Sequence, residues 1–390
     1  MKTQVAIIGA GPAGTLLSHL LGRAGIESVV LERQSRSYVL GRVRAGVLEW
    51  GTVELLRENG LGDRMDAEGF VHTTINIAWR GSDVLSIDTV DRVGQKMMAY
   101  GQTEIQHDLY EAADAAGTRL VFEAEDVALH DVDGDQPSVT YRHNGVEQRI
   151  EADFIAGCDG FHGVSRRTIP ADVLREYEKV YPFGWLGILS ETAPLPHLLY
   201  ANHERGFALC SMRKPNLSRY YVQCPISDTV EDWPDDRFWS ELFARVPPEF
   251  ESRIETGPSV EKSIAPVRSF VAEPMSYGKL HLAGDAAHIV PPTGAKGLNL
   301  AVSDVHYLSR AIAGHYGGDD TYLDSYSDMA LRRVWGAVRF SWSLTSLLHR
   351  FPDQTPFEQQ LQENELAHLN SSALAQAALA EQYVGLPFEV

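Results

Sequence analysis

The start of the chain combines a strand, a glycine-rich turn, a helix and a second strand that ends in an acid. The apolar run 5–8 leads into the turn 9–14, a helical pattern covers 15–23, and the apolar run 29–31 closes at Glu32. This order is typical of a βαβ unit that binds a dinucleotide, and it constrains the fold more than any other feature.

Each glycine of the turn has a physical task. Gly9 allows the tight turn, Gly11 lets the backbone approach a pyrophosphate, and Gly14 permits close packing of helix on strand. The helix N-terminus then offers unpaired N–H groups to the phosphates. Glu32 can accept hydrogen bonds from a ribose diol but repels a 2′-phosphate, so the turn favours NAD or FAD over NADP. A buried βαβ unit without a ligand is the alternative.

Two later motifs extend this pattern. A strand-like run at 154–156 leads to Asp159-Gly160, which alone is also a common plain turn. A second run at 280–283 leads to Gly284-Asp285 and then to a glycine-flanked helix start at 294–297. Free N–H groups at that helix start could hold a flavin carbonyl or a phosphate.

Together these motifs resemble the single-component (class A) flavoprotein aromatic hydroxylases. The resemblance rests on the glycine turn with Glu32, on Asp159-Gly160 followed by Ser165 and Arg166, and on Gly284-Asp285. The resemblance covers essentially the whole chain, and it is strongest to family members that act on 4-hydroxybenzoate. The further matching segments are 38–48, 181–187, 200–203, 205–210, 219–222, 284–299 and 383–387.

Charge and composition agree with a globular enzyme. The chain has 390 residues and a net charge of −19, which disfavours nonspecific binding to nucleic acid or anionic lipid. Against this background, Arg33, Arg36, Arg42 and Arg44 lie in a stretch without an acid. They indicate either a second anion site beside the first or a solvated helix face.

The cysteines and the first apolar stretch bear on location. Cys158, Cys210 and Cys224 have neither a metal nor a disulfide spacing, which favours a reducing cytoplasm. The stretch 5–21 is too interrupted by glycine, proline and polar residues to be a signal core or a membrane span.

For the fold, the resemblance implies a mixed α/β (α+β) protein with three parts. We expect a discontinuous Rossmann-like FAD-binding domain, an inserted antiparallel β-sheet substrate domain and a helical C-terminal region used in dimer contact. The expected ranges are 1–71, 99–180 and 270–320 for FAD, 72–98 and 181–269 for the substrate, and 321–390 for the helical region.

For the activity, the resemblance implies hydroxylation of 4-hydroxybenzoate to 3,4-dihydroxybenzoate with NADPH and O₂. A flavin C4a-hydroperoxide would attack the substrate phenolate. The implied cofactor is bound FAD, NADPH is the co-substrate, and the protein would be a homodimer without a metal, nucleic-acid or membrane partner.

The resemblance also implies roles for single residues. Tyr200, Tyr383 and His72 would carry a proton between substrate and solvent, while Pro292 and Thr293 border the reacting groups. The substrate would be held by Tyr200, Ser211, Met212, Arg213, Tyr221 and Pro292. Alternation along a strand places Ser211 and Arg213 on one face, where a carboxylate needs a fork of donors.

The cofactor residues are carried over in the same way. FAD would contact Gly9, Gly11, Ala13, Gly14, Glu32, Arg33, Arg42, Val43, Arg44, Ala45, Gly46, Val47, Gln102, Asp159, Asp285, Leu298 and Asn299. NADPH would contact Arg33, Gln34, Tyr38, Arg42, Arg44, His162, Arg166 and Arg268. NADPH is expected over NADH because the segment 33–40 holds Arg36 and Ser37 with no acid. Family members often have Ser where this chain has Ala13.

Three alternative functions are considered for this sequence. Another phenolic acid, such as 3-hydroxybenzoate or 3,4-dihydroxybenzoate, could be the substrate. A flavin-dependent halogenase is disfavoured because none of the seven tryptophans forms the Trp-x-Trp signature. A noncatalytic FAD-binding redox sensor would expect an added partner-binding module, for which the chain has no spare segment.

Overall fold

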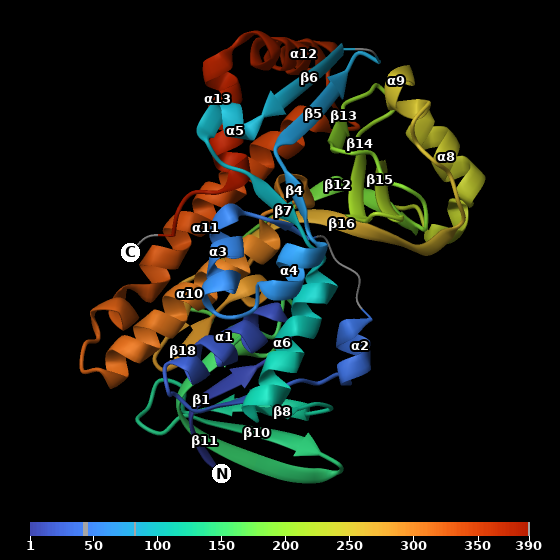
Figure 1. Ribbon diagram of the computed structural model, residues 1–390. Helices are drawn as coiled ribbons and strands as arrows, with labels where there is room; N and C mark the ends of the chain where they lie inside the picture. Colours follow the sequence, from blue (N-terminus) through green and yellow to red (C-terminus); the bar gives the residue numbers. More distant parts are fainter. Residues whose placement is uncertain (42–45, 82, 389–390) are drawn as a thin grey trace.

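The structure is a computed structural model that describes residues 1–41, 46–81 and 83–388. Within these residues the chain forms two large sheets, a small sheet between them, and helices that cover both (Figure 1). The mixed α/β class predicted from the sequence is confirmed.

The N-terminal sheet is built on the predicted strand–turn–helix–strand unit. Its centre is β1 (Lys2–Ile8), which pairs in parallel with β2 (Ser28–Leu31) on one side and with β11 (Val146–Gly157) on the other. The outer strands are β8 (Arg119–Val121), β9 (Glu125–His130), β10 (Ser138–His143), β17 (Ser276–Tyr277) and β18 (Leu280–Leu282). The apolar residues of β1 and β2 are buried because helices cover the sheet.

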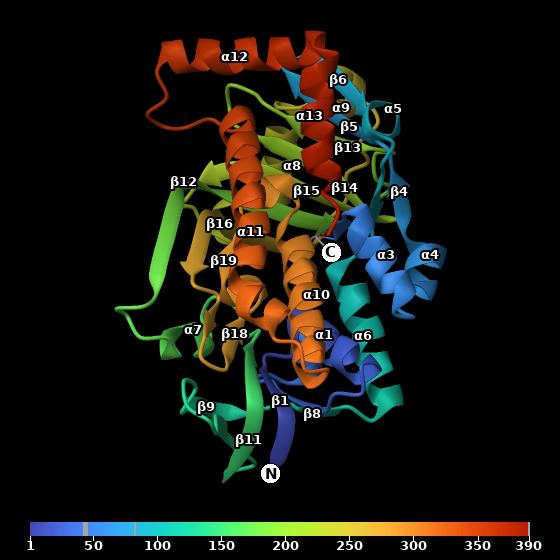
Figure 2. The ribbon, with the colours of Figure 1, turned by 90° about the vertical axis from the view of Figure 1, so that its left-hand side faces the viewer.

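Three helices pack together beside this sheet. They are α1 (Pro12–Arg23), α6 (Gln102–Ala116) and α10 (Gly297–Tyr316), and α1 contacts both of the others. The run 5–31 and the run 280–316 therefore meet in one unit although they are far apart in the sequence. Figure 2 shows α1, α6 and α10 side by side below the second sheet.

The second large sheet is mostly antiparallel, as expected for 181–269. Its order is β19 (His288–Ile289), β16 (Ser259–Glu273), β12 (Arg175–Ser190), β15 (Leu217–Pro225), β14 (Ala208–Lys214), β13 (Leu198–Ala201), β5 (Thr74–Trp79) and β6 (Asp83–Asp88). Among the described strand pairs of this second sheet, only the β13–β5 pair is parallel. One face packs on the C-terminal helices and the other on α8 (Asp235–Phe243) and α9 (Pro248–Glu251).

The remaining elements are short or helical. The small sheet is β3 (Val47–Leu48), β7 (Met97–Ala99) and β4 (Phe70–His72). The short helices are α2 (Arg36–Leu40), α3 (Trp50–Glu58), α4 (Asp63–Glu68), α5 (Thr89–Val93) and α7 (Ser165–Thr168). The chain ends in α11 (Thr321–Leu348), α12 (Pro356–Ser371) and α13 (Ala373–Val384), where the sequence predicts helices.

Four of the five expected domain limits, at 71/72, 98/99, 180/181 and 269/270, fall inside the strands β4, β7, β12 and β16. The limit at 180/181 lies inside β12, next to a register shift between Val180 and Gly184. The limit at 320/321 coincides with the start of α11. The three-part division itself stays a proposal. Among the described residues, no helix has the length and apolarity that a bilayer crossing requires.

Candidate active site

The turn after β1 has a backbone shape that requires glycine. Gly9 has a φ of 102°, and a Cβ there would lie 2.3 Å from the Cys158 carbonyl oxygen. A Cβ on Gly14 would lie 1.9 Å from the Gly9 oxygen, whereas at Gly11 no described atom comes within 4 Å. Gly11 is the N-cap of α1 and no side chain caps the helix. The first N–H groups of α1 therefore face open space, which is what a pyrophosphate needs.

The three glycine and acid motifs meet at this turn. Gly9 abuts Cys158, and a Cβ on Gly284 would lie 3.4 Å from the Cβ of Ala13. Glu32 is held in place because its carboxylate accepts the N–H groups of Ala10 at 3.0 Å and Gln34 at 2.9 Å. Asp285 is exposed between buried neighbours. The residues present fit a dinucleotide such as FAD.

Other expected FAD residues have partners inside the protein. Asp159 accepts the N–H of Ser165 at 2.9 Å and its hydroxyl at 3.0 Å, while its Oδ1 is buried without a partner among the described residues. Burial raises the pKa of Asp159. The buried Asn299 side chain accepts from Glu49 N–H and Thr52 and donates to two carbonyls, so it fastens the 47–52 region to α10. Its side chain has no hydrogen-bonding group left for a flavin.

Five further residues of the expected FAD set lie in the described part of the chain. Gly46 allows close contact with the 100–101 backbone, since a Cβ there would lie 2.1 Å from the Tyr100 oxygen. Gln102 begins α6, and Val47 and Leu298 are half-buried. Arg33 is exposed. Arg42, Val43, Arg44 and Ala45 lie outside the described residues.

A pair of buried tyrosines joins the second sheet to the last helix. The hydroxyls of Tyr200 on β13 and Tyr383 on α13 lie 2.5 Å apart, and Tyr200 also donates to the Thr293 carbonyl at 3.2 Å. Burial raises the pKa of Tyr200 well above its ordinary value and that of Tyr383 to about 12. Both are therefore neutral near pH 7 and can each donate and accept, as a proton relay requires.

His72 does not join this pair directly. It is buried at the end of β4, and neither ring nitrogen has a hydrogen-bond partner among the described residues. Burial lowers the pKa of His72 to about 4, and the charge of the nearby His197 contributes to the same decrease. The imidazole is therefore neutral at pH 7.

The candidate carboxylate site lies on β14 and β15. The Arg213 guanidinium donates to the Met212 carbonyl at 2.8 Å and to the Ser211 hydroxyl at 3.4 Å. The β14–β15 ladder shifts register at Arg213, and such a bulge re-aims a side chain. The Arg213 Nε is buried without a partner among the described residues, and Tyr221 interacts with the guanidinium. Met212 itself is buried.

Three of the expected nicotinamide-cofactor residues gather around Phe161. The Arg166 guanidinium lies 4.9 Å from the Phe161 ring, the Arg268 guanidinium also 4.9 Å, and the His162 ring 5.0 Å. Arg166 is buried and bonds Glu176 and the carbonyls of Ala286 and Phe161. These bonds take up three of the five N–H groups of its guanidinium. Arg268 pairs with Glu178 at 3.1 Å near the surface, and His162 is exposed, so a ligand can reach these two more readily.

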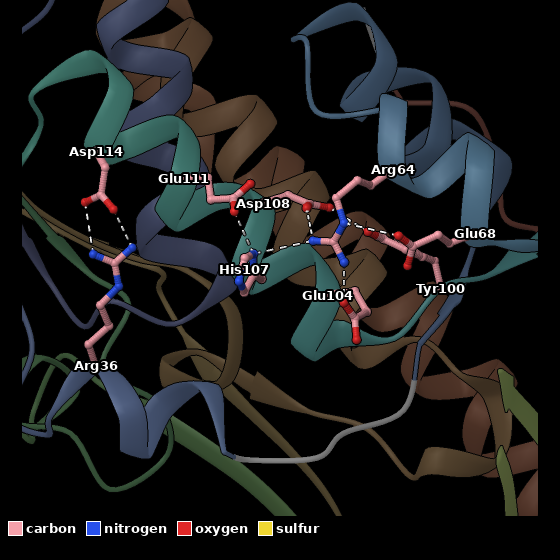
Figure 3. A network of polar contacts seen from close by, with 9 residues as sticks. All are labelled: Arg36, Arg64, Glu68, Tyr100, Glu104, His107, Asp108, Glu111 and Asp114. Carbon is pink, nitrogen blue, oxygen red and sulfur yellow. Dashed lines mark hydrogen bonds and ion pairs between the residues drawn. The ribbon is translucent and has the colours of Figure 1, made fainter.

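Arg36, the member of the arginine cluster that lies on α2, meets an acid far away in the sequence. Arg36 makes a two-bond ion pair with Asp114 of α6, at 2.6 and 3.0 Å (Figure 3). The Arg36 guanidinium also lies 4.9 Å from the centre of the Tyr110 ring. Helix α6 also binds Arg64 of α4, through the carboxylates of Glu104 and Asp108. The segment 33–40 itself has no acid, but α6 supplies one to Arg36.

Sequence reasoning missed several buried charged residues near the site. Arg219 is buried against the Tyr221 ring and bonds Glu261 at 3.1 Å. Lys296 is buried and donates to Glu49 at 2.6 Å. A lysine inside the glycine-flanked helix start was the available signal for the second pair, but nothing local marked Glu49 as its partner.

Comparison with known proteins supports one family. A family model described as an FAD binding domain matches residues 2–341. A p-hydroxybenzoate hydroxylase of Acinetobacter baylyi is 51% identical over 100% of this chain and 97% of its own length. A rifampicin monooxygenase of Streptomyces venezuelae is 26% identical over 83% of this chain and 67% of its own.

Solved structures agree on the fold. A p-nitrophenol 4-monooxygenase of Pseudomonas putida superposes with a TM-score of 0.83 at 18% identity, covering 98% of this chain and 99% of that one. At that identity the likeness concerns the fold alone. The family model and the full-length relative go further: the chain belongs to the family of FAD-dependent aromatic hydroxylases, flavoprotein monooxygenases that share this FAD-binding domain.

Proposed function

We propose that this FAD-dependent monooxygenase hydroxylates 4-hydroxybenzoate to 3,4-dihydroxybenzoate, using NADPH and O₂. The observation that carries the proposal is the buried Tyr200–Tyr383 pair, whose hydroxyls lie 2.5 Å apart. The 51% identity to a p-hydroxybenzoate hydroxylase supports the same substrate.

FAD supplies the activation of O₂ and the electrophilic oxygen when it is bound. Gly9, Gly11 and Gly14 with the N-terminus of α1 would hold its pyrophosphate, and Glu32 its ribose. Asp285 and Asp159 would lie at the ribityl side of the site. The protein's own part is to bind and orient the aromatic acid beside this group.

The carboxylate of the substrate would be bound by Arg213, Ser211 and Tyr221. The Arg213 Nε has no partner among the described residues, so a carboxylate would satisfy a buried donor. A hydrogen bond to a charged group of this kind contributes about 1.5–3 kcal/mol. This end of the site would select benzoates over neutral phenols.

The phenol end must favour the ionised substrate. A phenol with a pKa of about 10 is about three units from pH 7, which corresponds to roughly 4 kcal/mol. Tyr200 would hydrogen-bond the phenolate oxygen, and Tyr383 would take the proton onward. His72 is neutral, so its lone pair can accept a proton, and a water would have to join it to Tyr383. Pro292 and Thr293 would border the same oxygen.

For the reductant we propose NADPH over NADH. Arg33, Gln34 and Tyr38 lie on or beside α2, and the exposed ion pair of Arg36 with Asp114 can be exchanged for a 2′-phosphate. Arg268 and His162 would contact the remainder of the cofactor. If NADH gave the higher kcat/KM, this specificity would be wrong.

We also propose a homodimer formed through the C-terminal helices. Phe357 and Leu361 on α12 and Leu374 on α13 are 71%, 54% and 85% exposed, which is unusual for large apolar side chains. Light scattering at micromolar concentration would give twice the chain mass. A monomeric mass would contradict the proposal.

The free state of Cys158, Cys210 and Cys224, all buried, supports a reducing cytoplasm as the working compartment. Fractionation of cells that produce the protein from its own gene would check this. Recovery with exported proteins would contradict it.

The substrate is tested by NADPH oxidation and product analysis with each candidate acid. We expect 4-hydroxybenzoate to stimulate NADPH oxidation and to yield 3,4-dihydroxybenzoate in near-equal amount. Preferred turnover of 3-hydroxybenzoate or 3,4-dihydroxybenzoate would replace the substrate and leave the reaction class intact. A flavin that stays oxidised with NADPH and all three acids would favour a noncatalytic FAD protein.

A further inference from the structure

Three buried charged side chains form a chain of contacts beside the relay. Glu49, the N-cap of α3, accepts from Lys296 at 2.6 Å through one carboxylate oxygen and from Arg333 of α11 at 2.7 Å through the other. Only 7%, 4% and 12% of the Glu49, Lys296 and Arg333 side chains is exposed. Such a group is costly to bury unless every partner is present.

Lys296 and Arg333 also hydrogen-bond backbone carbonyl groups near the C-terminal end of the described chain. Lys296 Nζ donates to the Tyr383 carbonyl oxygen at 2.9 Å. Arg333 donates to the carbonyl oxygens of Leu386 at 2.8 Å and Pro387 at 3.2 Å. The segment Gly385–Phe388, here called the C-terminal strap, is thus bound by the same charges that border Tyr383.

The strap fits its place closely. Gly385 has a φ of 91°, and a Cβ there would lie 2.1 Å from the Glu49 Oε2. Phe388 stacks on His306 with ring centroids 5.0 Å apart, and the Arg333 guanidinium lies 5.1 Å from its ring. The strap therefore closes over the Glu49 carboxylate and ties the end of α13 to α3, α10 and α11.

We propose that Arg333 is a positioning residue for Tyr383. Together with Glu49 it fastens the C-terminal strap, and this holds the Tyr383 hydroxyl at hydrogen-bond distance from Tyr200. The inference rests on the proposed function, in which that pair moves the substrate proton. A chain end without such contacts frays, and a relay loses efficiency when its oxygen atoms separate.

The test compares Arg333→Gln with Arg339→Gln. Arg339 lies on the same helix and bonds Gln382 at 2.9 Å, one residue before Tyr383, but this contact is exposed and does not involve the strap. For Arg333→Gln we expect 3,4-dihydroxybenzoate per NADPH to fall about tenfold, with the lost oxygen recovered as hydrogen peroxide. FAD affinity and the KM for NADPH should stay within about twofold. Arg339→Gln should behave like the unchanged protein.

A second variant tests the strap without altering Arg333. A chain that ends at Gly385 should show the same loss of coupling. Adding Arg333→Gln should lower the coupling no further, because both changes remove the contacts between Arg333 and the strap. Amide hydrogen exchange of 373–384 should be faster in either variant than in Arg339→Gln.

The outcomes separate this inference from the proposed function. Absence of product with the unchanged protein would reject the proposed reaction. Equal coupling and equal exchange of α13 in Arg333→Gln and in the unchanged protein would overturn the positioning role. A lower melting temperature with unchanged coupling would reduce Arg333 to a structural residue and would overturn it as well.

Discussion

Two arginine–carboxylate pairs of similar length lie in very different surroundings. Arg333 and Glu49 are 2.7 Å apart with 12% and 7% of their side chains exposed. Arg36 and Asp114 are 2.6 Å apart with 39% and 56% exposed (Figure 3). Exposed pairs contribute little to stability, whereas breaking a buried pair leaves an uncompensated charge.

The difference separates two tasks in one protein. Under the proposed function, the buried corner around Glu49 would hold fixed groups beside the substrate and would gain from having no alternative partners. The exposed α2–α6 surface would bind and release the nicotinamide cofactor, so its ion pairs would have to exchange with a ligand. Burial, and not the length of the pair, sets which of these roles an arginine can have.

The largest expected effect concerns the buried corner. Lys296→Met leaves Glu49 with one cation fewer in a buried place, and we expect the free energy of unfolding to fall by about 3–5 kcal/mol. Urea denaturation measures it, with Arg57→Met as control, since that arginine pairs with Asp66 at 2.7 Å on the surface. Similar losses in both variants would remove the distinction between buried and exposed pairs.

The next effect concerns the relay. Tyr383→Phe removes the hydroxyl that hydrogen-bonds the Tyr200 hydroxyl, and we expect the rate of hydroxylation to fall by roughly a hundredfold while FAD stays bound. Tyr200→Phe should also impair hydroxylation. Single-turnover product measurements check both changes. Unchanged product formation in the two variants would discard the relay.

A smaller effect follows from pH. Burial lowers the pKa of His72 to about 4, so below about pH 6.5 the unfolded chain binds a proton that the folded chain does not. Stability therefore falls as the pH drops from about 6.5 towards 4, by about 2 kcal/mol at pH 5 for this residue. His72→Asn should flatten that decline in denaturation experiments. An unaltered pH profile for His72→Asn would contradict the assigned shift.

The smallest effect concerns the exposed surface. Asp114→Asn frees Arg36 for a 2′-phosphate, and we expect kcat/KM for NADPH to rise about threefold with that for NADH unchanged. Stability should change by less than about 1 kcal/mol. Asp66→Asn is the matched control. An equal response of NADPH and NADH to Asp114→Asn would mean that Arg36 does not contact the phosphate.

The sequence predicted the FAD turn and the broad fold because their signals are local. Gly14 is required because it packs against Gly9 in the same turn, and Gly9 because it packs against Cys158 at the end of the neighbouring strand. The spacing of apolar residues marks the strands and helices around this turn. The Tyr200–Tyr383 contact spans 183 residues and was expected only through resemblance.

For other contacts, nothing in the local sequence indicated which residue would be the partner. Glu49 meets Lys296 and Arg333 across 247 and 284 residues, and Arg36 meets Asp114 across 78. The low pKa of His72 depends on burial by packed elements, which a residue's neighbours in the sequence do not reveal. Charge pairing across the fold was therefore the part that sequence reasoning missed.

A monooxygenase of 4-hydroxybenzoate inserts one atom of dioxygen into the ring of its substrate. The decisive measurement is the mass of the product formed with NADPH under isotopically labelled dioxygen. We expect 3,4-dihydroxybenzoate carrying one labelled oxygen atom, at the carbon next to the original hydroxyl. Unlabelled product, or labelled hydrogen peroxide with no hydroxylated acid from the FAD-loaded protein, would contradict it.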